Sequence, residues 1–238
     1  MKIIERPSPN FDERAGEGEI GYIILHYTGM KSADEALARL TDADAKVSAH
    51  YTVDEDGTVY RHVDEAKRAW HAGASFWQDQ SDLNSLSIGI EIVNPGHEWG
   101  YRDFTDPQID AVIELCKEIM QRHEIDEENI LAHSDIAAAR KEDPGELFPW
   151  KKLAQHGIGI WPTVADEDTV KAAALNVERA LNDFGYDPRV KLRDKLMAFQ
   201  RHFAPEDVLD GRGGTETALV RGRLYALLAG HLISPNIS

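Results

Sequence analysis

The segment "EIGYIILHYT" (residues 19–28) decides the fold, because an apolar run rich in β-branched residues ends there in polar side chains. Such a run is typical of a strand that is buried within a sheet. The segment therefore predicts a buried strand with His26 at its carboxyl end.

Three more segments predict the rest of a sheet. "SAHYTVDEDGTVYRHV" (48–63) predicts two strands around an Asp-Gly turn, which is a hairpin signal. "SLSIGIEIVN" (85–94) predicts a strand with three isoleucines on one face and Glu91 on the other. "NILAHSD" (129–135) predicts a shorter strand that leads into His133.

Two segments between these strands predict helices. The first is "SADEALARLTD" (32–42), and the second is "TDPQIDAVIELCKEIMQRH" (105–123), where apolar residues follow helical spacing. Thr105 and Gln108 predict a capping box at the start of the second helix. Its Cys116 is the only cysteine of the chain, so we expect a core residue and no disulfide or cysteine-rich zinc site. Strands interleaved with helices predict an α/β domain with a central mixed β-sheet flanked by helices.

The sequence pattern changes after residue 162, beyond which no strand pattern occurs. We expect a first domain over residues 1–163 and a small C-terminal three-helix domain over 164–238. The second and third helices are predicted in "VKLRDKLMAFQRHF" (190–203) and "TETALVRGRLYALLAGHL" (215–232). The first helix is predicted over 166–185, with an apolar stripe of Val170, Ala174, Val177, Leu181 and Phe184.

The composition restricts the partners and the location. With 26 basic and 42 acidic residues, the formal net charge of −16 argues against a nucleic-acid partner and against an anionic membrane surface. No stretch is long and apolar enough to span a bilayer, and the N-terminus has no signal-peptide core. We therefore expect a monomeric protein that is cytoplasmic as the chain is written, or periplasmic if a leader has been removed.

Two histidines follow predicted strands, and the carboxyl ends of strands are where the sites of α/β domains gather. His26 and His133, together with Asp143, offer two nitrogens and one oxygen. This donor set suits zinc and leaves a fourth position for water. Zinc would lower the pKa of that water to about 7 and so provide a nucleophile at neutral pH.

Such a reaction needs a base for the proton of the water and a positive group near the oxyanion. Glu91 lies in an otherwise apolar strand, where an unpaired carboxylate is costly, and Lys141 lies two residues before Asp143. These residues could supply the base and the cation. Spacing alone supports only the hypothesis of a metal hydrolase, because a single histidine is more often a structural or surface residue than a ligand.

Five motifs occur together in this sequence, and they resemble those of a known family. They are "ILHYTGM" (24–30), "SAHYTVDEDGTVY" (48–60), "AWHAG" (69–73), "SIGIEIVN" (87–94) and "HSDIAAARKEDPGELFPW" (133–150). About the first 160 residues resemble the zinc-dependent N-acetylmuramoyl-L-alanine amidases of the type 2 amidase family. The similarity is greatest to the branch that processes muropeptides and carries a C-terminal peptidoglycan-binding domain.

The resemblance implies a role for each residue of the candidate centre. It implies that His26, His133 and Asp143 are zinc ligands. It implies that Glu91 is the general base and that Lys141 stabilises the transition state.

The resemblance also implies substrate contacts. It implies that His71 and His50 face the substrate and that Trp70 and Asn94 line the groove, although a structural, hydrogen-bonded role stays open for both histidines. Phage amidases and animal recognition proteins often have a tyrosine where this sequence has Ala49. The branch with Glu91 does without that tyrosine, so the difference agrees with the resemblance.

The implied activity is hydrolysis of the amide between N-acetylmuramic acid, or its 1,6-anhydro form, and L-alanine of peptidoglycan stem peptides. "LDGRGGTET" (209–217) is similar to the D-G-x-x-G-x-x-T pattern of small peptidoglycan-binding modules, although a generic loop with Thr215 or Thr217 as a helix cap would have the same pattern. Two alternatives stay open. One is a non-catalytic peptidoglycan-binding protein, which the complete set of ligands and helpers disfavours, and the other is a phage or secreted lytic amidase.

Overall fold

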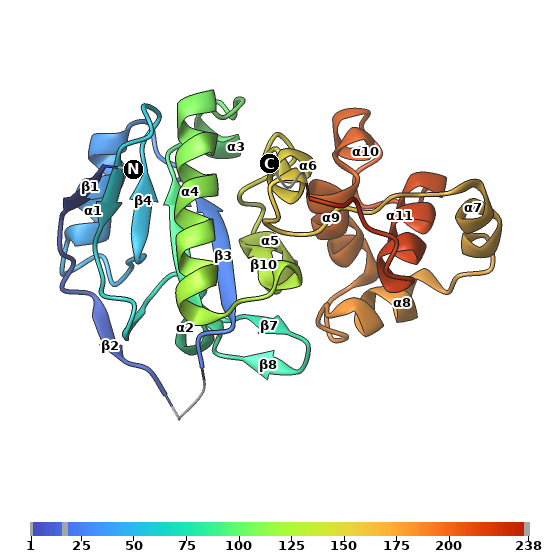
Figure 1. The fold of residues 1–238 in the computed structure, drawn as a ribbon, viewed down its shortest axis with the longest axis horizontal. Helices are drawn as coiled ribbons and strands as arrows, with labels where there is room; N and C mark the ends of the chain where they lie inside the picture. The colour runs from blue at the N-terminus through green and yellow to red at the C-terminus, as the bar shows by residue number, and fades with distance from the viewer. Residues whose placement is uncertain (1, 16–18, 236–238) are drawn as a thin grey trace.

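The computed structural model describes residues 2–15 and 19–235, and within these ranges its central element is a six-stranded sheet (Figure 1). The strands are β1 (Ile3–Glu5), β3 (Tyr22–Tyr27), β4 (Tyr51–Val53), β5 (Val59–Arg61), β9 (Ser87–Ile92) and β10 (Ile130–Ala132). They follow the order β1-β5-β4-β9-β3-β10. Strands β4 and β5 are antiparallel, and every other neighbouring pair is parallel. The predicted mixed sheet is therefore confirmed.

Two short ribbons accompany the sheet. In the first, β2 (Phe11–Glu13) pairs antiparallel with β6 (Lys67–Ala69). In the second, β7 (Phe76–Trp77) pairs antiparallel with β8 (Gln80–Ser81). The sequence did not predict β1, β2, β6, β7 or β8, because two or three residues without a turn motif or a longer apolar run beside them show too little pattern.

Helix α4 (Asp106–His123) covers one face of the sheet (Figure 1). Its apolar side, which includes the buried Cys116, packs against Ile23 and Leu25 of β3 and against the isoleucines of β9. Burial raises the pKa of the Cys116 thiol to about 12, as expected for a core residue. The other helical elements before residue 163 are α1 (Ala33–Thr41), α2 (Leu83–Leu86), α3 (Gly96–Trp99), the 3-10 turn η1 (Glu127–Asn129), α5 (His133–Ile136) and α6 (Trp150–Gln155).

The start of α4 differs in one detail from the predicted capping box. The Thr105 hydroxyl accepts a hydrogen bond from the Gln108 backbone amide at 3.3 Å, as expected. The Gln108 side chain, however, is buried and donates to the carbonyls of Val53 and Val93 at 3.3 and 2.9 Å. The Gln108 amide thus serves a buried carbonyl at the end of β9, a polar group that needs a donor once it is removed from water.

The C-terminal part of the chain is helical, and Figure 1 shows its helices gathered beside α5 and β10. The single helix predicted over residues 166–185 is wrong, because Asn176 begins a second helix by accepting the Arg179 amide at 3.0 Å. Val170 is consequently 75% exposed. In the described part of this region the three predicted segments form four helices, which are α7 (Asp166–Ala172), α8 (Val177–Phe184), α9 (Leu192–Phe203) and α11 (Ala218–Leu228). A fifth helix, α10 (Pro205–Leu209), lies between the second and third segments and was not predicted.

The C-terminal helices share a hydrophobic core with the face of the sheet opposite α4. Ile24 of β3 and Leu131 of β10 pack in one cluster with apolar residues of α8, α9 and α11. The end of the chain also returns to the predicted boundary, where residues 231–233 pair with residues 161–163. Within the described ranges, no helix has the length and apolar content needed to cross a membrane.

A buried carboxylate connects α5 to the C-terminal helices. Asp135 accepts hydrogen bonds from the Tyr186 hydroxyl and from His202 Nδ1, both at 2.7 Å. It also accepts the Ala132 amide at 2.9 Å, which caps α5. The His202 ring stacks on Trp150 with 3.7 Å between ring centroids. Tyr186 and His202 of the C-terminal region thus anchor the helix that begins at His133.

We expect Tyr186→Phe to lower the free energy of unfolding by about 1.5–3 kcal/mol, the usual range for a hydrogen bond to a charged group. The loss is large because the Asp135 oxygen that accepts this hydroxyl stays buried without its donor. Urea unfolding monitored by circular dichroism measures it. The matched control is Tyr60→Phe at a half-buried tyrosine, which should change stability by less than about 0.5 kcal/mol. Equal effects of the two substitutions would contradict the role of the Asp135 bond.

The loop "LDGRGGTET" joins α10 to α11. Thr217 is the helix cap, since its hydroxyl accepts the Val220 amide at 3.1 Å. Buried Asp207 accepts hydrogen bonds from the Thr217 hydroxyl and from Arg212, with Arg212 Nε at 2.9 Å. The Gln200 side chain of α9 accepts the Gly214 amide at 2.6 Å. The polar groups of this loop therefore hold α9, α10 and α11 together.

Candidate metal centre and substrate groove

Three side chains from distant parts of the sequence converge at the carboxyl end of the sheet. His26 is near the end of β3, His133 begins α5 directly after β10, and Asp143 lies in the following loop. The Ser134 amide donates to the Asp143 carbonyl at 3.0 Å and so ties this loop back to α5. All three side chains are buried.

The ligand atoms of these three residues lie in a tight triangle. His26 Nδ1 is 2.9 Å from His133 Nδ1 and 3.1 Å from Asp143 Oδ2, and the third edge, from His133 Nδ1 to Asp143 Oδ2, is 2.9 Å. Ligands around a tetrahedral zinc ion at about 2.0–2.1 Å are separated by about 3.3 Å, so the triangle is close to one face of such a tetrahedron. His26, His133 and Asp143 therefore form a group that could hold a metal ion.

The charge states of these three side chains also suit the binding of a cation. Burial, helped by the neighbouring His133, lowers the pKa of His26 to about 4, so that its imidazole is neutral at pH 7 and can donate a lone pair. Burial alone would raise the pKa of Asp143, but the charges and hydrogen bonds of His133 and His26 hold it well below the usual range. The group thus offers two neutral nitrogens and one carboxylate.

Glu91 lies on the same face of the sheet as His26. Strands β9 and β3 are in register at these two residues, and the three isoleucines of β9 point to the opposite face, toward α4. Burial, and then the charge of Asp143, raise the pKa of Glu91 well above its usual range, while the charge of Lys141 opposes the shift. Its Oε2 atom is buried without a hydrogen-bond partner among the described residues. A carboxyl group beside the candidate metal ligands, with one oxygen that no described residue bonds, is available to exchange a proton.

A groove of about 610 Å³ borders the candidate ligands, and its lining includes Glu91, His133, Lys141 and Asp143. The half-buried Lys141 has no hydrogen-bonding or ion-pairing partner for its ammonium group within residues 2–15 and 19–235. A crevice of about 60 Å³ opens beside Glu91 and shares Arg39 with the groove. The groove therefore offers a free cation and a carboxylate next to three potential ligands.

One wall of the groove comes from the C-terminal region. Asp194, Met197 and Arg201 line it, and their spacing places them on one face of α9. Arg201 donates to Glu142 at 3.1 Å, which ties α9 to the loop that carries Lys141 and Asp143. The sequence analysis missed these residues, because the α9 pattern indicated only a buried apolar face.

The four residues expected to contact substrate lie in different places. His50 is fully buried, and backbone groups occupy both ring nitrogens: Nδ1 accepts the Gly89 amide at 2.9 Å, and Nε2 lies 3.1 Å from the Lys67 carbonyl. Asn94 is also buried, with its side chain bonded to the Arg102 carbonyl and the Gly96 amide. These contacts do not support the expectation of substrate contact, because each side-chain polar atom of the two residues is already bonded within the protein and neither residue lines the groove.

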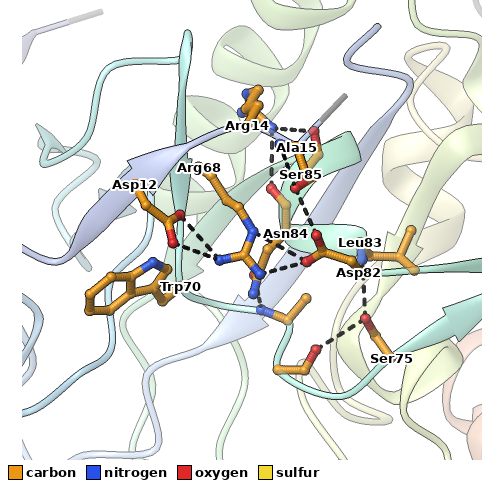
Figure 2. Close-up of polar contacts among 12 residues, drawn as sticks. Asp12, Arg14, Ala15, Arg68, Trp70, Ser75, Asp82, Leu83, Asn84 and Ser85 are labelled. Carbon is orange, nitrogen blue, oxygen red and sulfur yellow. Dashed lines mark hydrogen bonds and ion pairs between the residues drawn. The ribbon is translucent and has the colours of Figure 1, made fainter. Parts of the chain in front are cut away.

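The two aromatic residues of "AWHAG" differ from each other. Trp70 is partly buried in a polar cluster near Asp12 and Arg68, as Figure 2 shows, and it is absent from the lining of the groove. His71 does line the groove, but its ring nitrogens lie 3.0 Å from His26 Nε2 and 3.3 Å from Ser87 Oγ. Of the four, only His71 borders the candidate centre.

Comparisons with known proteins agree with this geometry. The chain is 36% identical to N-acetylmuramoyl-L-alanine amidase AmiD of Escherichia coli, over 92% of this chain and 88% of that protein. A structure of E. coli AmiD with the substrate anhydro-N-acetylmuramic acid-L-Ala-D-gamma-Glu-L-Lys is similar with a TM-score of 0.78 and covers 92% of this chain and 93% of its own. AmpDh3 from Pseudomonas aeruginosa, 30% identical, is similar with a TM-score of 0.80 over 94% of this chain and 97% of its own. Both similarities extend through the C-terminal helices.

Shorter relatives match the first part of the chain. The 1,6-anhydro-N-acetylmuramyl-L-alanine amidase AmpD of Haemophilus influenzae is 30% identical over 61% of this chain and 86% of its own length. The Amidase_2 family, N-acetylmuramoyl-L-alanine amidase, matches residues 16–146, which include the carboxyl ends of β3, β9 and β10 and the loop of Asp143. Because this match spans more than half of the residues and coincides with the candidate centre, the chain belongs to the N-acetylmuramoyl-L-alanine amidase family.

Proposed function

We propose that this protein hydrolyses the amide between N-acetylmuramic acid, or its 1,6-anhydro form, and L-alanine of a peptidoglycan stem peptide, with zinc as its metal. The observation that carries the proposal is the convergence of His26, His133 and Asp143 at a groove that is lined by the last two of them and by Glu91 and Lys141. This is the set that a zinc hydrolase needs: three ligands, a base and a cation.

The zinc ion would be held by His26 Nδ1, His133 Nδ1 and Asp143 Oδ2. When bound, zinc supplies Lewis acidity at a carbonyl and makes water acidic enough to attack at neutral pH. Glu91 is the proposed general base, which takes the proton of the attacking water and then gives it to the leaving amine of L-alanine. Its raised pKa suits a group that must both accept and release a proton near neutral pH.

Lys141 is the proposed oxyanion stabiliser. Its ammonium has no ion-pairing partner in the part of the chain that the structure describes, and Lys141 lines the same groove as Glu91, so it can face the negative charge that develops on the carbonyl oxygen. The loop geometry keeps it there, because the Lys141 amide donates to the Ala137 carbonyl at 3.0 Å and Arg140 donates to the carbonyls of Ala72 and Ala74.

The proposed substrates are muropeptides in cell-wall turnover or recycling. The E. coli AmiD structure holds an anhydro-N-acetylmuramyl tripeptide, and a P. aeruginosa AmpDh3 structure holds an anhydromuramic pentapeptide. We propose the same class of substrate here, a peptide attached to muramic acid. We propose no nucleic-acid partner, and we propose a monomer as the active form. The volume of the groove, about 610 Å³, is adequate for a sugar and a short peptide.

The division of the chain at residue 163 is part of this proposal. We propose that residues 1–163 carry the catalytic groups and that residues 164–238 contribute binding of peptidoglycan. The support for the second part is that Met197 and Arg201 of α9 form a wall of the groove. The polar groups of "LDGRGGTET" give no such support, since they are used within the helical region itself.

We expect the purified protein to release free stem peptide and an intact sugar from its substrate, and to lose this activity when zinc is removed. The measurement is mass spectrometry of products from sacculi and, separately, from anhydro-muropeptides, each with a chelator and with zinc restored. Faster cleavage of sacculi would favour wall remodelling or a lytic amidase, and faster cleavage of anhydro-muropeptides would favour recycling. Zinc-loaded protein that binds both substrates and cleaves neither would contradict the proposal and support a peptidoglycan-binding protein.

A further inference from the structure

The segment His71–Ala72 of "AWHAG" lies directly behind both candidate histidine ligands. His26 Nε2 is 3.0 Å from His71 Nδ1, and His133 Nε2 is 3.1 Å from the Ala72 carbonyl oxygen. These are the ring nitrogens that point away from the triangle of ligand atoms. Two neighbouring residues thus contact the outer nitrogens of both histidines.

The contact to Ala72 defines the tautomer of His133. A carbonyl oxygen only accepts hydrogen bonds, so His133 Nε2 carries the hydrogen and donates it. In the neutral imidazole, Nδ1 is then left with a lone pair, and this atom faces His26 and Asp143. The backbone therefore holds His133 in the form that can bind a metal ion through Nδ1.

A longer chain of hydrogen bonds defines the tautomer of His26. Ser87 Oγ donates to the Leu83 carbonyl at 2.5 Å, so it can accept from His71 Nε2, which is 3.3 Å away. With its hydrogen on Nε2, His71 has a lone pair on Nδ1 and accepts from His26 Nε2. Because this series of hydrogen bonds ends on the Leu83 carbonyl, all of its donors point in one direction. His26 Nδ1 therefore keeps its lone pair on the side of the candidate metal ligands.

The surroundings hold His71 in this position. A Cβ atom at Gly89 of β9 would lie 2.4 Å from His71 Cγ, so only glycine leaves room for the ring against the strand. The Asn84 side-chain oxygen accepts the backbone amides of His71 and Ala72 at 3.0 and 2.7 Å. In Figure 2, Asn84 lies on the α2 turn within a network of polar contacts. The Asn84 carbonyl accepts from Arg14 at 3.1 Å, and Asp82 binds Arg68 at 2.6 Å.

We propose that His71 is a positioning residue for the metal centre: it accepts a hydrogen bond from His26 and, with the Ala72 carbonyl, sets the tautomer and orientation of both histidine ligands. The proposal rests on the proposed function, in which those histidines hold zinc. In this proposal His71 orients the ligand histidines and does not recognise the substrate. Removal of the His71 side chain should therefore act first on zinc affinity. A comparable partner of a ligand histidine contributes about 10- to 100-fold in metal affinity.

Four variants test the inference, with the dissociation constant of Zn²⁺ measured by competition with a chromogenic chelator. We expect His71→Leu to weaken zinc binding about 10- to 100-fold. His71→Asn should restore binding to within about threefold of the original protein, because Oδ1 of asparagine is attached to Cγ like Nδ1 of histidine and accepts the same hydrogen bond. His71→Gln should not restore it, since its amide lies one carbon farther out. Gly89→Ala should weaken zinc binding by crowding an unchanged His71.

The matched control is His62→Asn. His62 is also a buried histidine, bonded to Thr52 and to the Arg6 carbonyl, and it is absent from the lining of the groove, so zinc affinity should not change. Zinc affinity of His71→Leu within twofold of the original protein would overturn the inference. So would equal losses in His71→Leu and His71→Asn, which would indicate that only packing of the ring matters. If His71→Leu fails to show a cooperative thermal transition, the comparison of His71→Asn with His71→Gln decides.

The same experiment separates this inference from the proposed function. A wild-type protein that binds no zinc would contradict the proposed function itself. Zinc binding and cleavage by the wild type, with unchanged affinity in the His71 variants, would contradict only the positioning role.

Discussion

Glu91→Gln is expected to lower the rate of amide hydrolysis by about 10²–10⁴, the range that general acid–base catalysis supplies. Glutamine keeps the shape of the side chain but cannot take a proton from the attacking water. Two observations support Glu91 as the proposed base: its Oε2 atom is buried with no hydrogen-bond partner among the described residues, and its pKa is raised. The measurement is kcat/KM on a defined muropeptide, with the zinc content of each sample determined by atomic emission.

Zinc content is the important companion measurement, because Glu91 is not one of the three residues whose ligand atoms converge. We expect Glu91→Gln to retain one zinc ion per chain. The matched control is Glu98→Gln, since Glu98 is an exposed carboxylate on α3 and is absent from the lining of the groove. Zinc-loaded Glu91→Gln with more than a tenth of the original activity would show that another group is the base.

Lys141→Met is expected to lower kcat by about 10²–10³ while KM and zinc affinity change little. The reason is that an oxyanion contact forms only as the reaction proceeds, so its loss acts on the transition state and not on binding. Methionine keeps most of the length of lysine and removes the charge. Single-turnover kinetics on the same muropeptide separates the chemical step from product release.

Lys171→Met provides the control for removal of a lysine charge, because Lys171 is exposed on α7 and pairs only with Glu167 among the contacts of the described chain. It should leave kcat unchanged. If Lys141→Met instead raised KM with kcat unaffected, Lys141 would be a binding residue and the source of oxyanion stabilisation would have to be another group of the groove.

Much of the first part of the fold could be predicted from local patterns. The strand around residues 22–27, the hairpin at 51–61 and the helix that contains Cys116 all occur where their periodicity indicated. These elements are predictable because burial on one or both faces imposes a regular spacing of apolar residues. The helix predicted over 166–185 failed for a local reason, since one asparagine cap outweighs an apolar stripe that continues on both sides of it.

The candidate site was only partly visible in the sequence. The motifs identified His26, Glu91, His133, Lys141 and Asp143, but the roles of the histidines in "AWHAG" and in the hairpin depend on hydrogen bonds between distant segments. His50 bonds to backbone groups of β6 and β9, whereas His71 contacts His26 across 45 residues of sequence. Two histidines in similar motifs therefore have different surroundings, which no spacing rule distinguishes.

The sequence by itself determined the type and order of the main strands and helices before residue 163 and the chemical identity of the candidate ligands, because these depend on residue type and on spacing over a few positions. The tertiary structure decided which groups meet. It placed α9 as a wall of the groove, linked Asp135 to Tyr186 and His202, and put the Ala72 carbonyl and His71 behind the two candidate ligand histidines. The physical reason is that these contacts join residues far apart in the chain, and their geometry exists only after the sheet and the C-terminal helices have packed around a shared core.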